Sequence, residues 1–238
     1  MNAQEQYQTE EAEMALDEEV PGYNEQRAEA IYRILKKHNI HRVLDVGCGL
    51  GKVTVYLAKK GMDVTGIDIS PRLIELAVKK AKEHQVNVQF KVVELNKFSV
   101  TEKFEGVLFA GVLEHIENEE QMMRDAQRVL KESGKIIIFD IPLFPWLYHP
   151  RDLRVGHLRR YTKSMILNKL TAQGYTNVQL TPYNFLMFFG SLYLLLFKKE
   201  EYPYGAVNRI TNKVLHLWYK HLENNFILDS LLFFGRSL

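Results

Sequence analysis

The sequence predicts an α/β fold, a doubly wound and mostly parallel β-sheet followed by a helical C-terminal cap. Three observations predict it. Short apolar segments alternate with helical segments, a glycine-rich turn follows the first apolar segment, and the residues after 184 are apolar with helical spacing. Strands that alternate with helices form βαβ units, which place helices on both faces of a parallel sheet. The length of 238 residues fits one such domain with an appended cap.

Six strands are expected, each from a short apolar run. They span residues 42–47, 63–70, 88–95, 105–111, 135–142 and 176–183. Helices are expected between most of them. The clearest begins at Ser70-Pro71, because serine caps a helix N-terminus and proline suits the first helical position. In the cap, apolar residues recur on one helix face at positions 207, 210, 214, 218 and 222.

These elements divide the chain into three parts. Residues 1–22 carry seven acidic residues and no basic one, and we expect this segment to be mobile. Residues 23–183 form the α/β domain, which contains an insertion at about 142–162 that is rich in aromatic and basic residues. Residues 184–238 form the apolar helical cap.

Composition excludes several classes of protein. The net charge of +2 gives no strongly basic domain, and no nucleic-acid-binding module is present, so we expect no nucleic-acid partner. The single cysteine, Cys48, excludes an internal disulfide and fits a reducing compartment. The first residues lack the basic start and apolar core of a secretory signal, so we expect a cytoplasmic protein. The longest apolar run, 185–197, is shorter than the roughly 20 residues that span a bilayer.

The glycine-rich turn "VLDVGCGLGK" matches neither of two common phosphate-binding loops. A P-loop has a glycine, four residues, then Gly-Lys and a hydroxyl residue. Here Gly51-Lys52 is followed by Val53, and Val46 stands at the position of the first glycine. A dinucleotide fingerprint that starts at Gly47 would place its third glycine at Lys52, whose side chain opposes close packing of helix on strand.

The pattern that remains is D-x-G-x-G-x-G, formed by Asp45, Gly47, Gly49 and Gly51. It resembles the first motif of class I S-adenosylmethionine-dependent methyltransferases. The resemblance implies a Rossmann-like methyltransferase fold and S-adenosyl-L-methionine as the cofactor. Glycines let the backbone approach the methionyl part of that cofactor, where Cβ atoms would collide with it. Asp45 is expected to orient the cofactor's amino group.

Further motifs extend the resemblance to about residue 190. Asp68 and Ile69, at the end of the second strand, resemble the ribose-binding segment, and we expect Asp68 to be solvated. Glu94 and Leu95, after the third strand, occupy the adenine-binding segment. Arg27, in the leading helix, is expected to meet the cofactor carboxylate. "GVLEHIEN" follows the fourth strand, as in small-molecule methyltransferases of ubiquinone and menaquinone biosynthesis. The family usually ends in an antiparallel seventh strand, and "FFGRSL" at 233–238 resembles its beginning.

The acceptor side offers two candidate bases. His115 follows the fourth strand and His157 follows the fifth, and histidine suits proton removal because its pKa lies near neutrality. The alternative for His115 is a packing or capping role at the start of the next helix. We expect no metal, because the required pairs of histidine and acidic residues do not converge in the sequence.

A Gly-His-x-Arg-Arg-Tyr segment contains His157 and resembles a segment of sugar, polysaccharide and lipid-linked biosynthesis methyltransferases. Arg159 and Arg160 are candidates for clamping a carboxylate or phosphate of the acceptor, since guanidinium groups match such anions. The alternative is ion pairing at the sheet edge. Tyr161 either packs over the acceptor or covers the core.

The leading hypothesis is therefore an S-adenosylmethionine-dependent methyltransferase that modifies a small or lipid-linked molecule at a hydroxyl oxygen. The alternatives are a non-catalytic cofactor-binding or assembly protein and, less favoured because of Lys52, a nicotinamide-dependent oxidoreductase. The apolar segment 185–199 has two interpretations. It is either a helix buried against the sheet or a homodimer partner, or a peripheral membrane contact in which Lys198 and Lys199 meet anionic headgroups.

Overall fold

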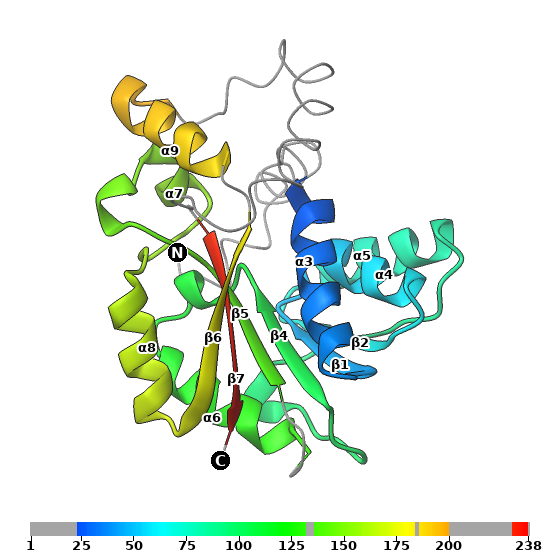
Figure 1. Cartoon of the computed structure of the whole chain (residues 1–238). Helices are drawn as coiled ribbons and strands as arrows, with labels where there is room; N and C mark the ends of the chain where they lie inside the picture. The colour runs from blue at the N-terminus through cyan, green and yellow to red at the C-terminus, as the bar shows by residue number, and fades with distance from the viewer. Residues whose placement is uncertain (1–22, 132–135, 184–185, 200–229, 238) are drawn as a thin grey trace.

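The structure is a computed structural model that describes residues 23–131, 136–183, 186–199 and 230–237. It contains a seven-stranded sheet in the order β3-β2-β1-β4-β5-β7-β6 (Figure 1). The strands are β1 (Arg42–Val46), β2 (Asp63–Asp68), β3 (Gln89–Val92), β4 (Gly106–Ala110), β5 (Ile136–Pro142), β6 (Tyr175–Tyr183) and β7 (Ser230–Ser237). Strands β1 to β5 pair in parallel, which confirms the predicted doubly wound, Rossmann-like α/β fold.

The strand order reverses between β1 and β4, which are neighbours although β2 and β3 lie between them in the chain. In open α/β sheets, ligands bind beyond the carboxyl ends of the strands at such a reversal. The glycine-rich turn begins at the end of β1, so the fold places this turn at the reversal.

Helices cover both faces of the sheet, as the alternating pattern predicted. The described helices are α3 (Tyr23–Lys37), α4 (Lys52–Lys59), α5 (Pro71–Glu83), α6 (Glu119–Val129), α7 (Pro150–Arg154), α8 (Lys163–Ala172) and α9 (Leu186–Phe197), with 3-10 turns η1 (Leu95–Lys97), η2 (Leu113–His115) and η3 (Pro145–Leu147). Figure 1 shows α3, α4 and α5 on one side of the sheet and α6 and α8 on the other. The predicted start of α5 is confirmed, because the Ser70 side chain accepts a hydrogen bond from Leu73 N–H.

Each face of the sheet has its own hydrophobic core. On one face, Ile31 and Leu35 of α3 pack with Val43 of β1. On the other, Phe109 of β4 stacks on Phe139 of β5 with ring centroids 5.0 Å apart. All seven residues of β5 are buried, as expected for a strand that helices cover on both faces.

The end of the predicted cap belongs to the sheet. Residues 230–237 form β7, which runs antiparallel between β5 and β6. The expectation of a helical cap over all of 184–238 is therefore wrong for this segment, whereas the terminal strand that the family resemblance suggested is present. A strand in this position is fixed by pairing with β5 and β6, which local helical spacing does not reveal.

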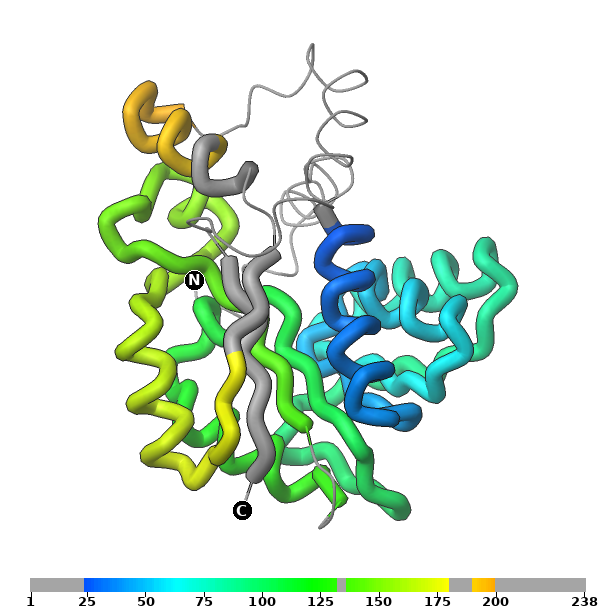
Figure 2. Tube along the Cα trace, viewed as in Figure 1, coloured from blue at the N-terminus to red at the C-terminus, as the bar shows by residue number. Residues whose placement is uncertain are grey.

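Helix α9 is the described part of the predicted cap, and it contacts α7 and η3 (Figure 2). Among the helices that the structure describes, none is long and apolar enough to cross a membrane. The predicted acidic segment 1–22 and the cap residues 200–229 lie outside the described residues.

Candidate functional site

A pocket of about 390 Å³ opens at the carboxyl ends of the strands around the β1/β4 reversal. It is lined by seven residues that the sequence singled out: Gly47, Gly49, Asp68, Ile69, Glu94, Leu95 and His115. These residues come from the last residue of β2 and from the segments that follow β1, β2, β3 and β4. Four separate motifs thus meet at one pocket, as the predicted parallel sheet requires.

The glycines of the first turn have two different reasons to be glycine. Gly47 and Gly49 both have φ in the left-handed region, at 67° and 51°. A Cβ on Gly47 would lie 2.7 Å from Cγ2 of Val112, so the packing of the protein itself excludes a side chain there. A Cβ on Gly49 would meet no protein atom within 4 Å. Gly49 therefore presents bare backbone to the pocket.

Asp68 ties the turn after β1 to the turn after β2. Its Oδ2 accepts a hydrogen bond from Gly49 N–H at 2.9 Å, and its Oδ1 accepts one from Ser70 N–H at 2.9 Å. The side chain lines the pocket, yet Asp68 is only 8% exposed, and burial raises its pKa. The expectation of a solvated carboxylate is wrong, because the two turns close around it.

Asp45 lies behind the glycine turn and does not line the pocket. Its Oδ2 accepts a hydrogen bond from the Thr54 hydroxyl at 2.6 Å. Its Oδ1 is buried and has no hydrogen-bond partner among the described residues. Burial raises the pKa of Asp45 to about 7, and the charge of Asp68 adds to this rise. The carboxyl thus keeps one acceptor oxygen for a donor that the described residues do not supply.

Arg27 of α3 is not among the residues that line the pocket, and it pairs with Asp140 of β5. The distance from Arg27 Nε to Asp140 Oδ2 is 2.8 Å, and both side chains are largely buried. Its terminal guanidinium nitrogens lie 3.5 Å from where a Cβ on Gly111 would stand, and Gly111 lines the pocket. Arg27 thus lies next to Gly111 of the pocket lining, and its contact with a cofactor carboxylate stays a prediction.

The segment after β3 is held in place by Arg128 of α6. Its guanidinium donates hydrogen bonds to the carbonyl oxygens of Leu95 at 2.7 Å and Asn96 at 3.1 Å. This contact fixes the turn η1, and Leu95 and Asn96 of this turn line the pocket together with the preceding Glu94. Arg128 and Asn96 could not be found from the sequence, because nothing in the local pattern connects α6 to this turn.

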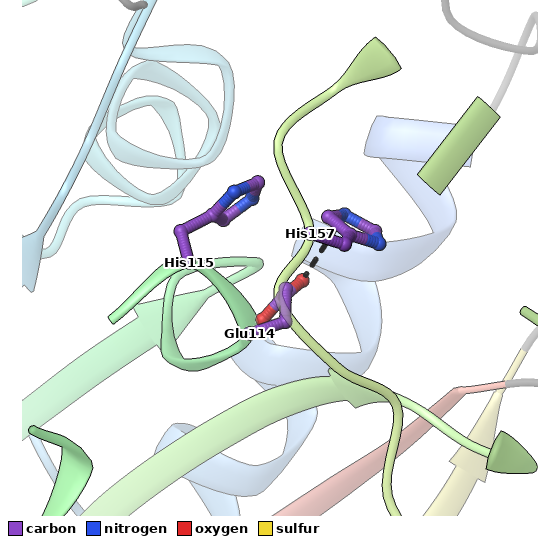
Figure 3. Close-up of side chains that lie close together, drawn as sticks. All are labelled: Glu114, His115 and His157. Atoms are coloured by element: carbon purple, nitrogen blue, oxygen red, sulfur yellow. Dashed lines mark ion pairs between the residues drawn. The ribbon is translucent and has the colours of Figure 1, made fainter. Parts of the chain in front are cut away.

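The two histidines that the sequence singled out lie close together, with Glu114 beside them (Figure 3). The rings of His115 and His157 have centroids 4.8 Å apart. His157 Nε2 lies 3.8 Å from Glu114 Oε1. One ligand-type atom of each of the three residues lies within 4.8 Å of the others. The prediction that histidine and acidic residues do not converge is therefore wrong, because β4 and β5 are neighbours and bring the following loops together.

Burial controls the protonation of this cluster. It lowers the pKa of His115 to about 3, with a further contribution from His157, so His115 is neutral at physiological pH. It raises the pKa of Glu114 to about 7. Burial alone would also raise the pKa of Asp152, but the hydrogen bond from His157 and the charge of Arg160 hold that pKa well below its usual range.

The residues predicted to bind the acceptor have structural partners. Arg160 is 5% exposed, and its Nε lies 2.9 Å from Asp152 Oδ2. Arg159 donates to the carbonyl oxygen of Ile116 at 2.9 Å and pairs with Glu119. Tyr161 is fully buried in the core. The geometry favours ion pairing and core packing for these three side chains over the predicted contact with the acceptor. Asp152 was missed, although it stands only five residues before His157.

Comparison with known proteins identifies the family. A family model described as a methyltransferase domain matches residues 37–177, which is more than half of the chain. The chain belongs to this methyltransferase family. This confirms the resemblance that the glycine turn and the later motifs carried.

Two curated relatives are similar over part of their length. The chain is 32% identical over 124 residues to the demethylmenaquinone methyltransferase of Tropheryma whipplei (strain Twist), covering 52% of this chain and 49% of that protein. It is 32% identical over 100 residues to the ubiquinone biosynthesis O-methyltransferase of Coxiella burnetii (strain RSA 331 / Henzerling II), covering 42% and 43%. The chain thus spans half or less of the length of these relatives.

Solved structures share the fold. The plantazolicin methyltransferase BpumL in complex with SAH has a TM-score of 0.66 at 17% identity, covering 99% of this chain and 94% of that one. The magnesium protoporphyrin IX methyltransferase of Synechocystis PCC 6803 with bound SAH has a TM-score of 0.58 at 16% identity, covering 90% and 84%. At these identities the likeness establishes the architecture alone.

Proposed function

We propose that this chain transfers a methyl group from S-adenosyl-L-methionine to a small-molecule acceptor. The observation that carries the proposal is the convergence of the glycine turn, Asp68 and the Glu94–Leu95 turn on one pocket at the strand-order reversal. The cofactor supplies an electrophilic methyl group on a sulfonium. Relatives named for menaquinone and ubiquinone methylation support a small-molecule acceptor.

The residues present fit this cofactor. Gly49 leaves open space above its backbone, and Asp45 keeps a buried acceptor oxygen toward which a donor such as an ammonium would be drawn. In this proposal the Asp68 carboxylate accepts from the ribose hydroxyls, and the Leu95 backbone amide meets the adenine. Arg27 reaches the cofactor carboxylate from the wall at Gly111. Together these groups orient the methyl donor, and alignment is a large part of the work in such a displacement.

The charge around the pocket distinguishes the cofactor classes. The described residues that line the pocket include four acidic ones and no lysine or arginine: Asp68, Glu94, Glu117 and Asp125. This balance favours a ligand that carries a sulfonium and an ammonium. It disfavours the pyrophosphate of a dinucleotide, because like charges in a poorly solvated site repel strongly. The electrostatics and Lys52 thus both argue against the nicotinamide alternative.

Calorimetry with three ligands tests the proposal. S-adenosylmethionine and S-adenosylhomocysteine should bind, and NAD should not. Binding of NAD alone would overturn the assignment. Turnover is then measured as release of S-adenosylhomocysteine across hydroxylated quinols, sugars and lipid-linked glycans. Cofactor binding without turnover on any acceptor of this panel would favour the non-catalytic assembly protein.

We propose an apolar or lipid-linked acceptor with a hydroxyl target, and a cytoplasmic protein that contacts the membrane peripherally. Exposed apolar side chains in η3, α7 and α9 support this: Trp146, Leu153, Leu196 and Phe197. Such a cluster suits contact with lipid or with a second copy of the chain. Co-sedimentation with anionic liposomes, from protein that is monodisperse without detergent, separates the two. Absence of sedimentation, together with a dimer in light scattering, would leave a homodimer surface.

Asp68→Ala should weaken S-adenosylhomocysteine binding by about 1.5–3 kcal/mol, the range for losing a charged hydrogen-bond partner. It should also lower the free energy of unfolding by about 1–3 kcal/mol, since Gly49 and Ser70 N–H lose their acceptor. Asp68→Asn keeps one acceptor oxygen and should recover part of the stability. Calorimetry and urea unfolding measure the two effects. Unchanged affinity in both variants would remove Asp68 from the site.

Asp45 should release protons when the cofactor binds. With a pKa of about 7, its carboxyl is about half protonated at pH 7 in the free protein. A nearby ammonium stabilises the charged form and lowers this pKa, so binding expels up to roughly half a proton at pH 7. Affinity should therefore rise with pH up to about 7, the pKa of the free protein, and level off above it. Calorimetry of S-adenosylhomocysteine binding in buffers with different heats of ionisation measures the release. The same release from Asp45→Asn would show that another group is responsible.

A further inference from the structure

We propose that Glu114, His115 and His157 form a binding site for one divalent transition-metal ion at the acceptor side of the pocket. Figure 3 shows the three side chains, with Glu114 and His115 on the turn after β4 and His157 on the loop after α7. The inference rests on their separations, on the partners of the two imidazoles and on the burial of the carboxylate.

The separations are close to those of a metal site. Ligand atoms about 2.1 Å from a tetrahedral ion lie about 3.4 Å from one another. Glu114 Oε1 and His157 Nε2 are already 3.8 Å apart. The three ligand-type atoms all lie within 4.8 Å. A side-chain movement on the order of 1 Å therefore closes the set around an ion.

Both imidazoles have the second partner that is typical of metal-bound histidine. His115 Nδ1 lies 3.1 Å from the carbonyl oxygen of Gly156, which can only accept a hydrogen bond. His157 Nδ1 lies 2.6 Å from Asp152 Oδ1. A proton on Nδ1 of each ring satisfies these two contacts, and Nε2 is then the nitrogen that can bind a metal. A carbonyl or carboxylate on the far nitrogen is the usual arrangement behind a metal-bound histidine.

Arg160 strengthens the arrangement behind His157. It is buried against Asp152, with Nε 2.9 Å from Oδ2 and 3.1 Å from Oδ1. This ion pair fixes the carboxylate that orients the His157 ring. The conspicuous Gly-His-x-Arg-Arg-Tyr segment thereby gains a role in aiming His157, which neither the cofactor pocket nor the core requires.

Glu114 supplies the charge that a cation would balance. It is 3% exposed, and its Oε2 has no hydrogen-bond partner among the described residues. The nearby guanidinium of Arg27 is already paired with Asp140. A buried carboxylate is costly unless it is paired or coordinates a metal. Glu114 thus brings Oε1 close to His157, while its Oε2 has no hydrogen-bond donor among the described residues.

The donor set selects the kind of ion. Two imidazoles and one carboxylate suit Zn²⁺ and neighbouring first-row ions better than Mg²⁺ or Ca²⁺, which prefer oxygen ligands. Three protein ligands leave a coordination position open, as in catalytic zinc sites. Since His115 lines the pocket, we expect that position to face the pocket.

A role in methyl transfer follows, and this step rests on the proposed function. An acceptor hydroxyl at the open position would give its proton to solvent more readily. The oxygen lone pair then forms the bond to the methyl carbon, while the sulfur–carbon bond breaks and its electrons remain on sulfur. His115 and His157 act as ligands in this scheme, in place of the general bases that the sequence suggested.

Metal binding is tested without cofactor or acceptor, so its failure is distinct from failure of the proposed function. Tag-free protein is stripped with chelator and titrated with ZnCl₂ in a calorimeter, and the wild type should bind one tight equivalent. Glu114→Gln, His115→Asn and His157→Asn should each weaken that binding at least 10-fold, on the order of what loss of a supporting partner alone costs. His84→Ala, an exposed histidine at the end of α5, should leave it unchanged.

Two further measurements guard against variants that fold poorly. Co²⁺ should give visible absorption bands in the wild type that are lost in the three ligand variants and retained in His84→Ala. Zn²⁺ should raise the melting temperature of the wild type and leave that of Glu114→Gln unchanged. Absence of saturable Zn²⁺ binding to the wild type, or equal affinity in the wild type and all three ligand variants, would overturn the proposal.

Discussion

Gly49→Val should reduce S-adenosylhomocysteine affinity by at least roughly 100-fold, which corresponds to about 2.7 kcal/mol. Gly49 has a φ of 51°, and a Cβ there would point into space that no protein atom occupies within 4 Å. The valine side chain would stand where we place the methionyl part of the cofactor. The left-handed backbone adds a stability cost of about 1–2 kcal/mol, because a β-branched residue is poorly accommodated there. Calorimetry gives the affinity, and thermal unfolding gives the stability.

Gly61→Val separates the two effects. Gly61 follows α4 with a φ of 84°, and a Cβ there also meets no protein atom within 4 Å. It is not among the residues that line the pocket. This variant should carry a similar backbone cost and bind the cofactor normally. If Gly49→Val folds and binds S-adenosylhomocysteine as Gly61→Val does, the glycine turn does not contact the cofactor, and the cofactor binds elsewhere.

The cofactor side could be predicted from the sequence because each part of it is local. In a parallel sheet, a turn that follows a strand always opens at the same edge. The position in the fold of a short motif at the end of a strand, such as Asp45 to Gly51 or Asp68, can therefore be predicted from the local sequence. The sequence did not reveal that Asp68 is enclosed, since its burial depends on how two turns approach each other.

The acceptor side could be predicted only in part, because its contacts join distant segments. His115 and His157 were each noticed, yet their approach requires the pairing of β4 with β5. The burial of Arg160 depends on α7 and α9, and the place of β7 depends on a return of the chain to the sheet. A basic pair such as Arg159-Arg160 looks alike in sequence whether it faces a ligand or a buried carboxylate.

Arg160→Met should lower the free energy of unfolding by about 3–5 kcal/mol, which is the cost of removing one member of a buried ion pair. Asp152 would remain buried without its guanidinium, and the carbonyl oxygen of Leu143 would lose a donor. For a chain of this size the melting temperature should fall by roughly 6–20 °C. Urea unfolding and calorimetric melting measure the change.

Arg72→Met is the matched control for Arg160→Met. Arg72 pairs with Glu75 on the exposed face of α5, at 2.9 Å between Nη1 and Oε2. Exposed pairs of this kind contribute about 0–1 kcal/mol, so the control should unfold almost as the wild type does. If Arg160→Met instead has unchanged stability and a raised KM for an anionic acceptor, Arg160 binds the acceptor, as the sequence suggested. A loss of stability that Arg72→Met does not share, with KM unchanged, would establish Arg160 as a positioning residue for Asp152 and, through it, for His157.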